Sequence, residues 1–186
     1  MATNLNHCCE KNPDPATAAG ERGRKGLEIS QQSVGRLQNL PLFGGINSAT
    51  IEMILGLSSL VRKKKGEYFF REGEAGASAF VMQKGSASII KSFEQSEYLI
   101  RHISEGDCFG EMAIIDCLPR SASVKADVDA DAIEITASAL LDVYQRDLEQ
   151  FTLIQMNMAR EVSRRLREVS DRLSAYRLGR NPDLNS

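Results

Sequence analysis

The residues that usually build nucleic-acid stacking surfaces or membrane spans are scarce in this sequence. Tryptophan is absent and aromatic residues make up only 6% of the 186 positions, which argues against a base-stacking surface for single strands. No apolar run approaches the ~20 residues needed to cross a bilayer, and the N-terminus lacks the apolar core of a signal peptide. We therefore expect no membrane association and a cytoplasmic location.

A surplus of basic charge is also missing. The 23 Lys and Arg residues are balanced by 25 Asp and Glu residues, for a formal net charge of −2. Proteins held on nucleic acid through phosphate contacts usually carry a basic surplus. We expect no nucleic-acid partner.

Cysteine and histidine are too few and too scattered for a metal site. The four cysteines, at positions 8, 9, 108 and 117, have no metal-type or disulfide-framework spacing, so reduced thiols are expected. His102 is the only histidine in the predicted folded body, which excludes a site built from clustered histidines. We also find no phosphate-loop motif and no plausible Ser/His/Asp arrangement. The sequence therefore predicts no metal, no catalytic residue and no enzyme activity.

Composition divides the chain into a folded body and two tails. Residues 1–32 are polar and rich in small residues, and such a segment buries too little apolar surface to offset the entropy of ordering it. We predict a flexible tail over 1–32, one domain over 33–176, and a short tail over 177–186.

Periodicity predicts a mainly β body flanked by helices. Apolar residues at helical spacing place helices at 33–40, from an N-cap at Ser48 to about Leu60, at 137–144 and at 148–176. Between them, short runs rich in branched and aromatic residues alternate with glycine turns, as is typical of an antiparallel sandwich or barrel. We place strands at 67–70, 79–83, 86–91, 98–103, 121–126 and 130–136.

The long C-terminal helix carries a heptad pattern. Apolar residues spaced 4, 3, 4 and 3 apart form a seam, namely Val162, Leu166, Val169, Leu173 and Tyr176. Such a seam packs either on the helix's own barrel or on a second chain. A homodimer through 148–176 and an intramolecular packing both remain open.

The segment from Phe109 to Val124 carries the chemistry. Gly110 lets the backbone approach a ligand, and free amides at the following helix start attract an anion. Arg120 can fork onto two anionic oxygens, whereas an ionised Glu111 only accepts and suits hydroxyls. A ligand with one phosphate and a nearby sugar hydroxyl would satisfy this set.

This segment resembles the phosphate-binding cassette of the cyclic nucleotide-binding domain family, found in catabolite activators and protein kinase A regulatory subunits. The shared pattern is Phe-Gly-Glu, a short variable run, and then Pro-Arg-Ser-Ala-Ser-Val, with nine residues from Glu111 to Arg120. The resemblance extends from Leu40 to about Tyr176. It implies an antiparallel β-roll, or jelly roll, with N-terminal helices and a C-terminal helix pair.

The resemblance also implies ligand contacts. Glu111 would accept from the ribose 2′-hydroxyl and Arg120 would bind the cyclic phosphate, with Ser121 beside it. The other residues expected at the ligand, through backbone contacts or as pocket lining, are Gly110, Met112, Ala113 and Ala122. Ser170 matches one member of a threonine–serine pair that reaches adenine in the bacterial activator, whereas Val169 departs from that pattern.

The implied ligand is cAMP first, with cGMP as the alternative, because a serine at position 121 serves either base. No effector domain is recognised in this sequence, so we expect a stand-alone member that signals through its C-terminal helices to an unknown partner protein. A non-sensing dimerisation module with a vestigial pocket is the alternative reading. A DNA-binding regulator with an atypical arm is a third and weaker one.

Overall fold

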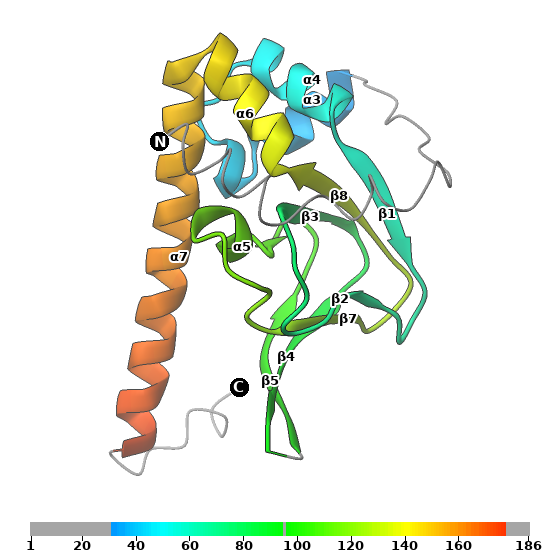
Figure 1. Ribbon diagram of the computed structural model, residues 1–186, viewed down its shortest axis with the longest axis vertical. Coiled ribbons are helices and arrows are strands. Elements are labelled where there is room, and N and C mark those ends of the chain that lie inside the picture. The colour runs from blue at the N-terminus through cyan, green and yellow to red at the C-terminus, as the bar shows by residue number, and fades with distance from the viewer. Residues whose placement is uncertain (1–30, 95, 178–186) are drawn as a thin grey trace.

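The computed structural model describes residues 31–94 and 96–177, so the predictions for residues 1–30 and 178–186 lie outside the described residues. Helices precede and follow the strands along the chain, and in space they gather at one end of the strands and along one side (Figure 1). The helical elements are α3 (Gln31–Gln38), the 3-10 turn η1 (Pro41–Phe43), α4 (Ser48–Gly56), α5 (Met112–Ile115), α6 (Ala137–Arg146) and α7 (Leu148–Arg177). The strands are β1 (Ser59–Lys63), β2 (Tyr68–Phe70), β3 (Ser78–Lys84), β4 (Ala87–Phe93), β5 (Ser96–Ile103), β6 (Cys108–Phe109), β7 (Ser123–Ala126) and β8 (Ala130–Thr136).

The strands form two antiparallel sheets of four strands each, in the orders β1-β8-β3-β6 and β2-β7-β4-β5. Successive strands often lie in different sheets, as in a jelly roll. The predicted fold class, a mainly β roll with flanking helices, is confirmed. β4 and β5 extend beyond the roll as a hairpin (Figure 1). β5 is an edge strand because it stands last in the order of its sheet.

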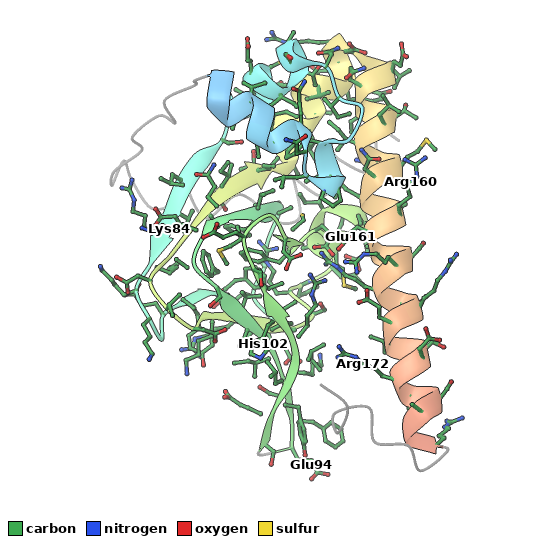
Figure 2. All side chains as sticks on the ribbon, turned by 180° about the vertical axis from the view of Figure 1, so that it is seen from behind. Lys84, Glu94, His102, Arg160, Glu161 and Arg172 are labelled. Atoms are coloured by element: carbon green, nitrogen blue, oxygen red, sulfur yellow. The ribbon has the colours of Figure 1, made fainter. Side chains whose placement is uncertain are left out.

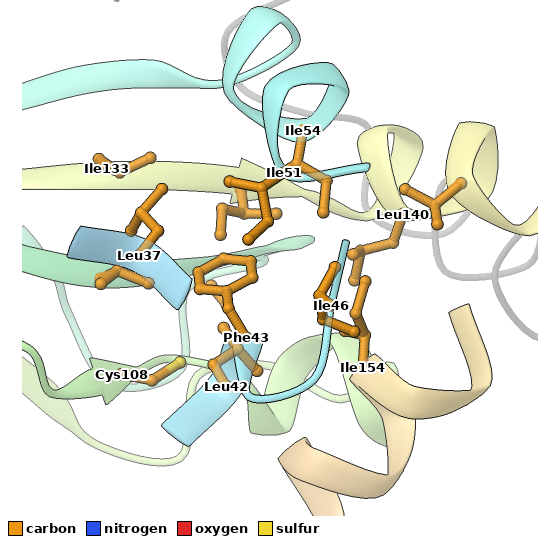
Figure 3. Close-up of a cluster of buried hydrophobic side chains, with 14 of the residues drawn as sticks. Leu37, Leu42, Phe43, Ile46, Ile51, Ile54, Cys108, Ile133, Leu140 and Ile154 are labelled. Atoms are coloured by element: carbon orange, nitrogen blue, oxygen red, sulfur yellow. The ribbon is translucent and has the colours of Figure 1, made fainter. Parts of the chain in front are cut away.

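Two apolar clusters hold this architecture together. One joins the helices to the first sheet, with Phe43, Ile51 and Ile54 packed near Ile154 of α7 (Figure 3). The other fills the roll, where the rings of Phe80 and Phe109 stack with centroids 5.3 Å apart. Because β6 supplies Phe109 to this second cluster, the first residue of the cassette is anchored in the core of the roll.

The first strand differs from the sequence-based expectation. The helix predicted to reach about Leu60 ends at Gly56, and Ser59–Lys63 forms β1, paired with β8. Leu60 pairs with Ile133, which pairs in turn with Val81 of β3. This non-local pairing outweighs the helical spacing of the preceding apolar residues.

Helix starts were predicted to within a few residues. The N-cap of α4 is Asn47, not Ser48, and its side chain accepts from the amide of Thr50 at 2.8 Å. α3 begins at Gln31, two residues before the expected start.

α7 is the longest of the described elements, and its two halves differ in burial. Its first half is buried through Phe151, Ile154 and Met158. Its second half runs beside the roll toward the end of the β4–β5 hairpin (Figure 1). No helix within 31–94 and 96–177 is long and apolar enough to span a membrane.

Candidate functional site

Arg120 is buried inside the cassette rather than exposed on its surface. Its Nη1 donates to the carbonyl oxygens of Ser78 at 2.6 Å and Gly110 at 2.8 Å, and Nη2 donates to the Ser78 hydroxyl at 3.0 Å. The guanidinium also lies over the Phe70 ring, 4.1 Å from its centroid. These contacts hold a permanent positive charge beside the backbone of the cassette.

Two glycines make room for that guanidinium. Gly110 has φ +76°, and a Cβ there would lie 2.7 Å from Nη1 of Arg120. A Cβ on Gly76 would lie 2.4 Å from Nε of Arg120. The glycine required at 110 therefore serves both the left-handed turn and the approach of Arg120.

Glu111, the next residue, points to α7 instead of capping α5. The residue is only 3% exposed, and Oε1 accepts from Nη1 of Arg165 at 2.5 Å. Arg165 also donates through Nη2 to the Cys108 carbonyl. An arginine of α7 therefore binds the carboxylate that was predicted to accept from a sugar hydroxyl.

A charge network surrounds this pair. Glu161 of α7 accepts from Nε of Arg165 at 2.9 Å and from Nη2 of Arg164 at 2.6 Å. Figure 2 shows Glu161 directed from α7 toward the strands. Arg101 of β5 lies 3.8 Å from the same carboxylate and 2.8 Å from Asp107. The network therefore links the β5 hairpin, the cassette and α7.

The two glutamates of the network have opposite pKa shifts. Burial raises the pKa of Glu111, and the nearby Arg165 only partly offsets it. The hydrogen bond from Arg164 lowers the pKa of Glu161 to about 2, with Arg165 acting in the same direction. Burial also raises the pKa of the Cys108 thiol, which argues against a reactive thiolate there.

The remaining predicted residues of the cassette differ in how far they are exposed. Ser121 is exposed, its hydroxyl lies 3.7 Å from the sulfur of Met112, and its carbonyl accepts from Nζ of Lys91 at 2.7 Å. Met112 is exposed, whereas Ala113 is buried and Ala122 is half-buried. The structure thus brings seven of the eight predicted residues into one cassette.

Ser170 is the one predicted ligand-binding residue that lies outside the cassette. It is exposed on α7, and at about 100° per residue it lies about 140° around the helix from Arg165. Ser170 therefore faces away from the cassette of its own chain, and its assignment to the ligand stays a prediction that requires a second chain.

Sequence reasoning missed Arg165 and Arg101. Each has one partner far away in the chain: Arg165 meets Glu111 across 54 positions, and Arg101 of β5 faces Glu161 of α7. The sequence does show that Glu161 and Arg165 stand four residues apart, as in an ion pair on one helix face. The same spacing is equally typical of a helix face exposed to solvent, so it did not identify the contact with Glu111.

Cavities near the site are small. A cavity of about 110 Å³ lies between η1, the β5–β6 connection and α7, and its lining includes Asp107, Glu111 and Glu161. Drug-sized ligands occupy roughly 300–1,000 Å³, so this cavity alone is too small for a nucleotide. Within 31–94 and 96–177, no three His, Cys, Asp or Glu side chains are grouped as metal ligands.

One Ser/His/Asp cluster that the sequence does not predict lies outside this site. Ser88, His102 and Asp127 do meet, on the outer face of the second sheet. However, the Ser88 hydroxyl donates to Asp127 at 2.8 Å and lies 3.2 Å from Nδ1 of His102, and this same nitrogen is 3.5 Å from Asp127. The serine is thus bound to the acid, which differs from the serine–base–acid order that activates a nucleophile.

Fold and cassette together define the class of this domain. It is an antiparallel β-roll in which the Gly110 turn lies between a buried arginine and a buried carboxylate, the combination that the resemblance of the Phe109–Val124 segment implies. Residues 60–147 match the sequence profile of the family described as Cyclic nucleotide-binding domain. This part of the chain, just under half of it, is therefore similar to a cyclic nucleotide-binding domain.

Similar proteins agree with that assignment. The chain is 30% identical over 148 residues to a cAMP-dependent protein kinase regulatory subunit of Mycosarcoma maydis, covering 79% of this chain and 27% of the relative. It is 31% identical over 111 residues to a cGMP-dependent protein kinase of Toxoplasma gondii, covering 60% of this chain and 11% of the relative. The chain therefore spans about a quarter or less of these relatives.

The fold has solved counterparts. A cyclic nucleotide-binding domain from Methylobacillus flagellatus superposes with a TM-score of 0.69 at 21% identity, covering 77% of this chain and 81% of that one. At this identity the likeness concerns the fold alone.

Proposed function

We propose that this protein is a receptor for a cyclic nucleotide and not an enzyme. The observation that carries the proposal is that one cassette places the buried Arg120 guanidinium on the Gly110 carbonyl and the buried Glu111 carboxylate in the next residue. A fixed guanidinium suits the cyclic phosphate, and an acceptor-only carboxylate suits the ribose hydroxyl. No other part of the described chain combines a buried cation and a buried anion in this way.

The proposed ligand is cAMP, and cGMP is the alternative. The relative from Mycosarcoma maydis is named for cAMP and the one from Toxoplasma gondii for cGMP. Ser121 is exposed at the edge of the cassette, where its hydroxyl can serve the phosphate of either nucleotide. Affinity of about 10 μM or tighter is expected from the size of the ligand alone.

The proposed output runs through α7. Because Arg165 binds Glu111 at 2.5 Å, a ribose hydroxyl that engages Glu111 acts on the same carboxylate that holds α7 on the cassette. Occupancy then shifts the position of α7 only if the ligand binds the released arrangement more tightly. We propose that a partner protein in the cytoplasm reads this shift.

The second half of α7 is also the proposed dimer seam. Leu166, Val169 and Leu173 are 68%, 54% and 52% exposed. They follow the heptad spacing that pairs helices, so a second copy of this chain is the proposed occupant. A homodimer would also place a partner's Ser170 within reach of a cassette that its own Ser170 does not face.

Calorimetric titration of the purified chain with cAMP and cGMP tests the receptor function. The wild type should bind at least one nucleotide at about 10 μM or tighter. Arg120→Ala should reduce the affinity by at least about tenfold, because a charge-assisted contact contributes about 1.5–3 kcal/mol. Ser121→Ala should only weaken binding.

Arg62→Ala is the matched control, since Arg62 is an exposed arginine on β1 paired with Asp131 at 3.8 Å. It should bind as the wild type does. Absence of heat with both nucleotides, from folded wild-type protein, would leave only the dimerisation-module function.

A further inference from the structure

One face of α7 carries a serine with an arginine on each side. Residues three and four positions apart are neighbours on a helix surface, so Arg160 and Arg167 flank Ser163. All three residues are exposed. They line one shallow groove along α7, whose other polar residues are Arg164, Glu168 and Asp171. The serine hydroxyl therefore lies between two positively charged side chains.

This face is separate from the surfaces of α7 that have been assigned above. At about 100° per residue, Ser163 and Arg167 each lie about 160° around the helix from Arg165, which binds the cassette. Ser163 also lies about 100° from Val162, the first residue of the seam. The groove thus points away from the cassette and lies beside the seam rather than on it.

The two flanking arginines can bind an anion formed at Ser163. Arg167 has no hydrogen-bond or ion-pair partner within 31–94 and 96–177. Arg160 has one neutral partner, since its Nη1 donates to Oδ1 of Asn157 at 3.0 Å. Arg164, by contrast, is bound by two glutamates of α7. The cations left for an anion in the groove are therefore those at i−3 and i+4 of Ser163.

Arg160 also connects the groove to the interior. Asn157, its partner, is buried, and Nδ2 of Asn157 donates to the carbonyls of Leu42 at 3.1 Å and Gly44 at 2.9 Å. These carbonyls belong to η1 and the residue after it. An anion that draws Arg160 toward Ser163 removes the donor from Oδ1 of Asn157, at the junction of α7 with η1.

A second serine on α7 supplies an internal comparison. The sequence Arg-Glu-Val-Ser occurs twice and ends at Ser163 and at Ser170. Ser170 follows Arg167 at the same spacing, but it has Ser174 at i+4 and Asp171 beside it. The two serines therefore share the residues before them, and only Ser163 has a cation on both sides.

We propose that Ser163 is a phosphorylation site whose phosphate is held between Arg160 and Arg167 and draws Arg160 from Asn157. A protein kinase would transfer the γ-phosphoryl group of a nucleoside triphosphate. The bond from its phosphorus to the bridging oxygen breaks, the bond to Oγ of Ser163 forms, the hydroxyl proton passes to the kinase's base, and nucleoside diphosphate leaves. The proposal is independent of nucleotide binding at the cassette.

The charge and accessibility of this segment support the proposal. A phosphoserine carries about −1.5 to −2 charges at pH 7 and three acceptor oxygens, which suit the donors of arginine. Every residue from 166 to 174 is exposed. A segment with so few buried contacts opens locally at low cost, and this opening gives a kinase access to the hydroxyl.

Kinase treatment of the full chain tests the site. The wild type and Ser163→Ala are incubated with ATP, magnesium and a protein kinase that selects serines with an arginine three positions before them. Mass spectrometry should place phosphate on Ser163 of the wild type, and the corresponding peptide of Ser163→Ala should carry none. Phosphate on other serines with none on Ser163 would overturn the proposal.

Phosphoserine incorporated during translation at position 163 or 170 tests the arginine pair. Phosphorus NMR gives the midpoint of the second ionisation of each phosphate. Nearby positive charge favours the dianion, so the midpoint should be about half a pH unit or more lower at 163 than at 170. In Arg167→Gln, the midpoint at 163 should rise to about the value at 170 in the wild type. Arg62→Gln, on the exposed arginine of β1, should change neither midpoint.

Hydrogen exchange tests the link to the interior. Phosphoserine at 163 should speed the exchange of amides around 42–46, and Arg160→Gln should do the same without phosphate. Phosphoserine at 170 should leave these amides unchanged. Equal midpoints at 163 and 170 would overturn the binding of the phosphate by two arginines. Unchanged exchange at 42–46 with phosphoserine at 163 would overturn the release of Arg160 from Asn157.

Discussion

At the scale of single residues, Arg120 has both a structural and a binding role. Its guanidinium donates to the backbone carbonyls of Ser78 in β3 and Gly110 in the cassette and covers the Phe70 ring. A bound phosphate would have to compete with these carbonyls. The stronger, charge-assisted contact to an anion makes that exchange favourable.

The structural role predicts a cost in stability. Arg120→Ala leaves the carbonyls of Ser78 and Gly110 without their donor, and each buried unpaired group costs about 1–3 kcal/mol. Urea unfolding should therefore show a loss of about 2 kcal/mol or more for Arg120→Ala. Arg62→Ala, an exposed pair, should lose about 0–1 kcal/mol. Equal losses in the two variants would contradict the buried contacts of Arg120.

Glu161 predicts a pH dependence of stability. Its pKa is lowered from 4.5 to about 2 in the folded chain, first by the hydrogen bond from Arg164. A carboxyl whose folded pKa is depressed adds stability above its unfolded pKa and loses it as the pH falls toward the folded pKa. Wild type should thus be more stable than Glu161→Gln at pH 7, and the difference should shrink between pH 4.5 and about 2.

Glu111 should behave in the opposite way. Burial raises its folded pKa, so its contribution to stability falls as the pH rises from the ordinary value of 4.5 through the folded value. Glu111→Gln removes this dependence, and its stability relative to wild type should therefore increase with pH over that window. Unfolding curves at a series of pH values compare the two variants directly, and parallel trends for both would contradict the assignment.

At the scale of elements, the turn between β3 and β4 depends on glycine. Gly85 has φ +86°, and a Cβ there would lie 2.5 Å from the Asp129 carbonyl oxygen. Gly73 has φ +80° but open space around it. Gly73→Ala should cost about 1–2 kcal/mol from backbone strain alone, and Gly85→Ala clearly more because of the backbone clash. Similar thermal stabilities of the two variants would argue against this packing.

The elements also show how far a sequence determines a site. The cassette was predictable because Gly110, Glu111 and Arg120 lie within one short segment. β1 was not, because its pairing with β8 depends on residues about 70 positions away, for example Leu60 with Ile133.

The contacts of Arg101 and Arg165 were not predictable for the same reason. Their partners are fixed only when the hairpin, the cassette and α7 pack together, and a helix sequence alone cannot distinguish a buried arginine from a solvated one. The Ser88–His102–Asp127 cluster was missed because three separate strand ends meet there.

The seam on α7 predicts a concentration-dependent dimer. Replacing the exposed Leu166 and Leu173 with Asp should leave the fold intact, since neither side chain is buried, and should abolish pairing. Sedimentation velocity should show a dimer for wild type and a monomer for the double variant. A monomeric wild type across concentrations would contradict the seam, and a double variant that still dimerises would place the interface elsewhere.

At the scale of the whole molecule, hydrogen bonds and ion pairs connect the cassette to α7. Arg165 joins them directly, and Arg101 and Glu161 connect the hairpin to the same point. The central claim is that nucleotide bound at the cassette changes how α7 is held.

Hydrogen exchange of α7 with and without cAMP tests this claim most directly. The account predicts that cAMP changes the exchange of amides around 161–173 in the wild type, and that the change disappears in Arg120→Ala. Protection confined to the cassette, with α7 unchanged in the wild type, would contradict the coupling. No change anywhere with either nucleotide would contradict the receptor function as well.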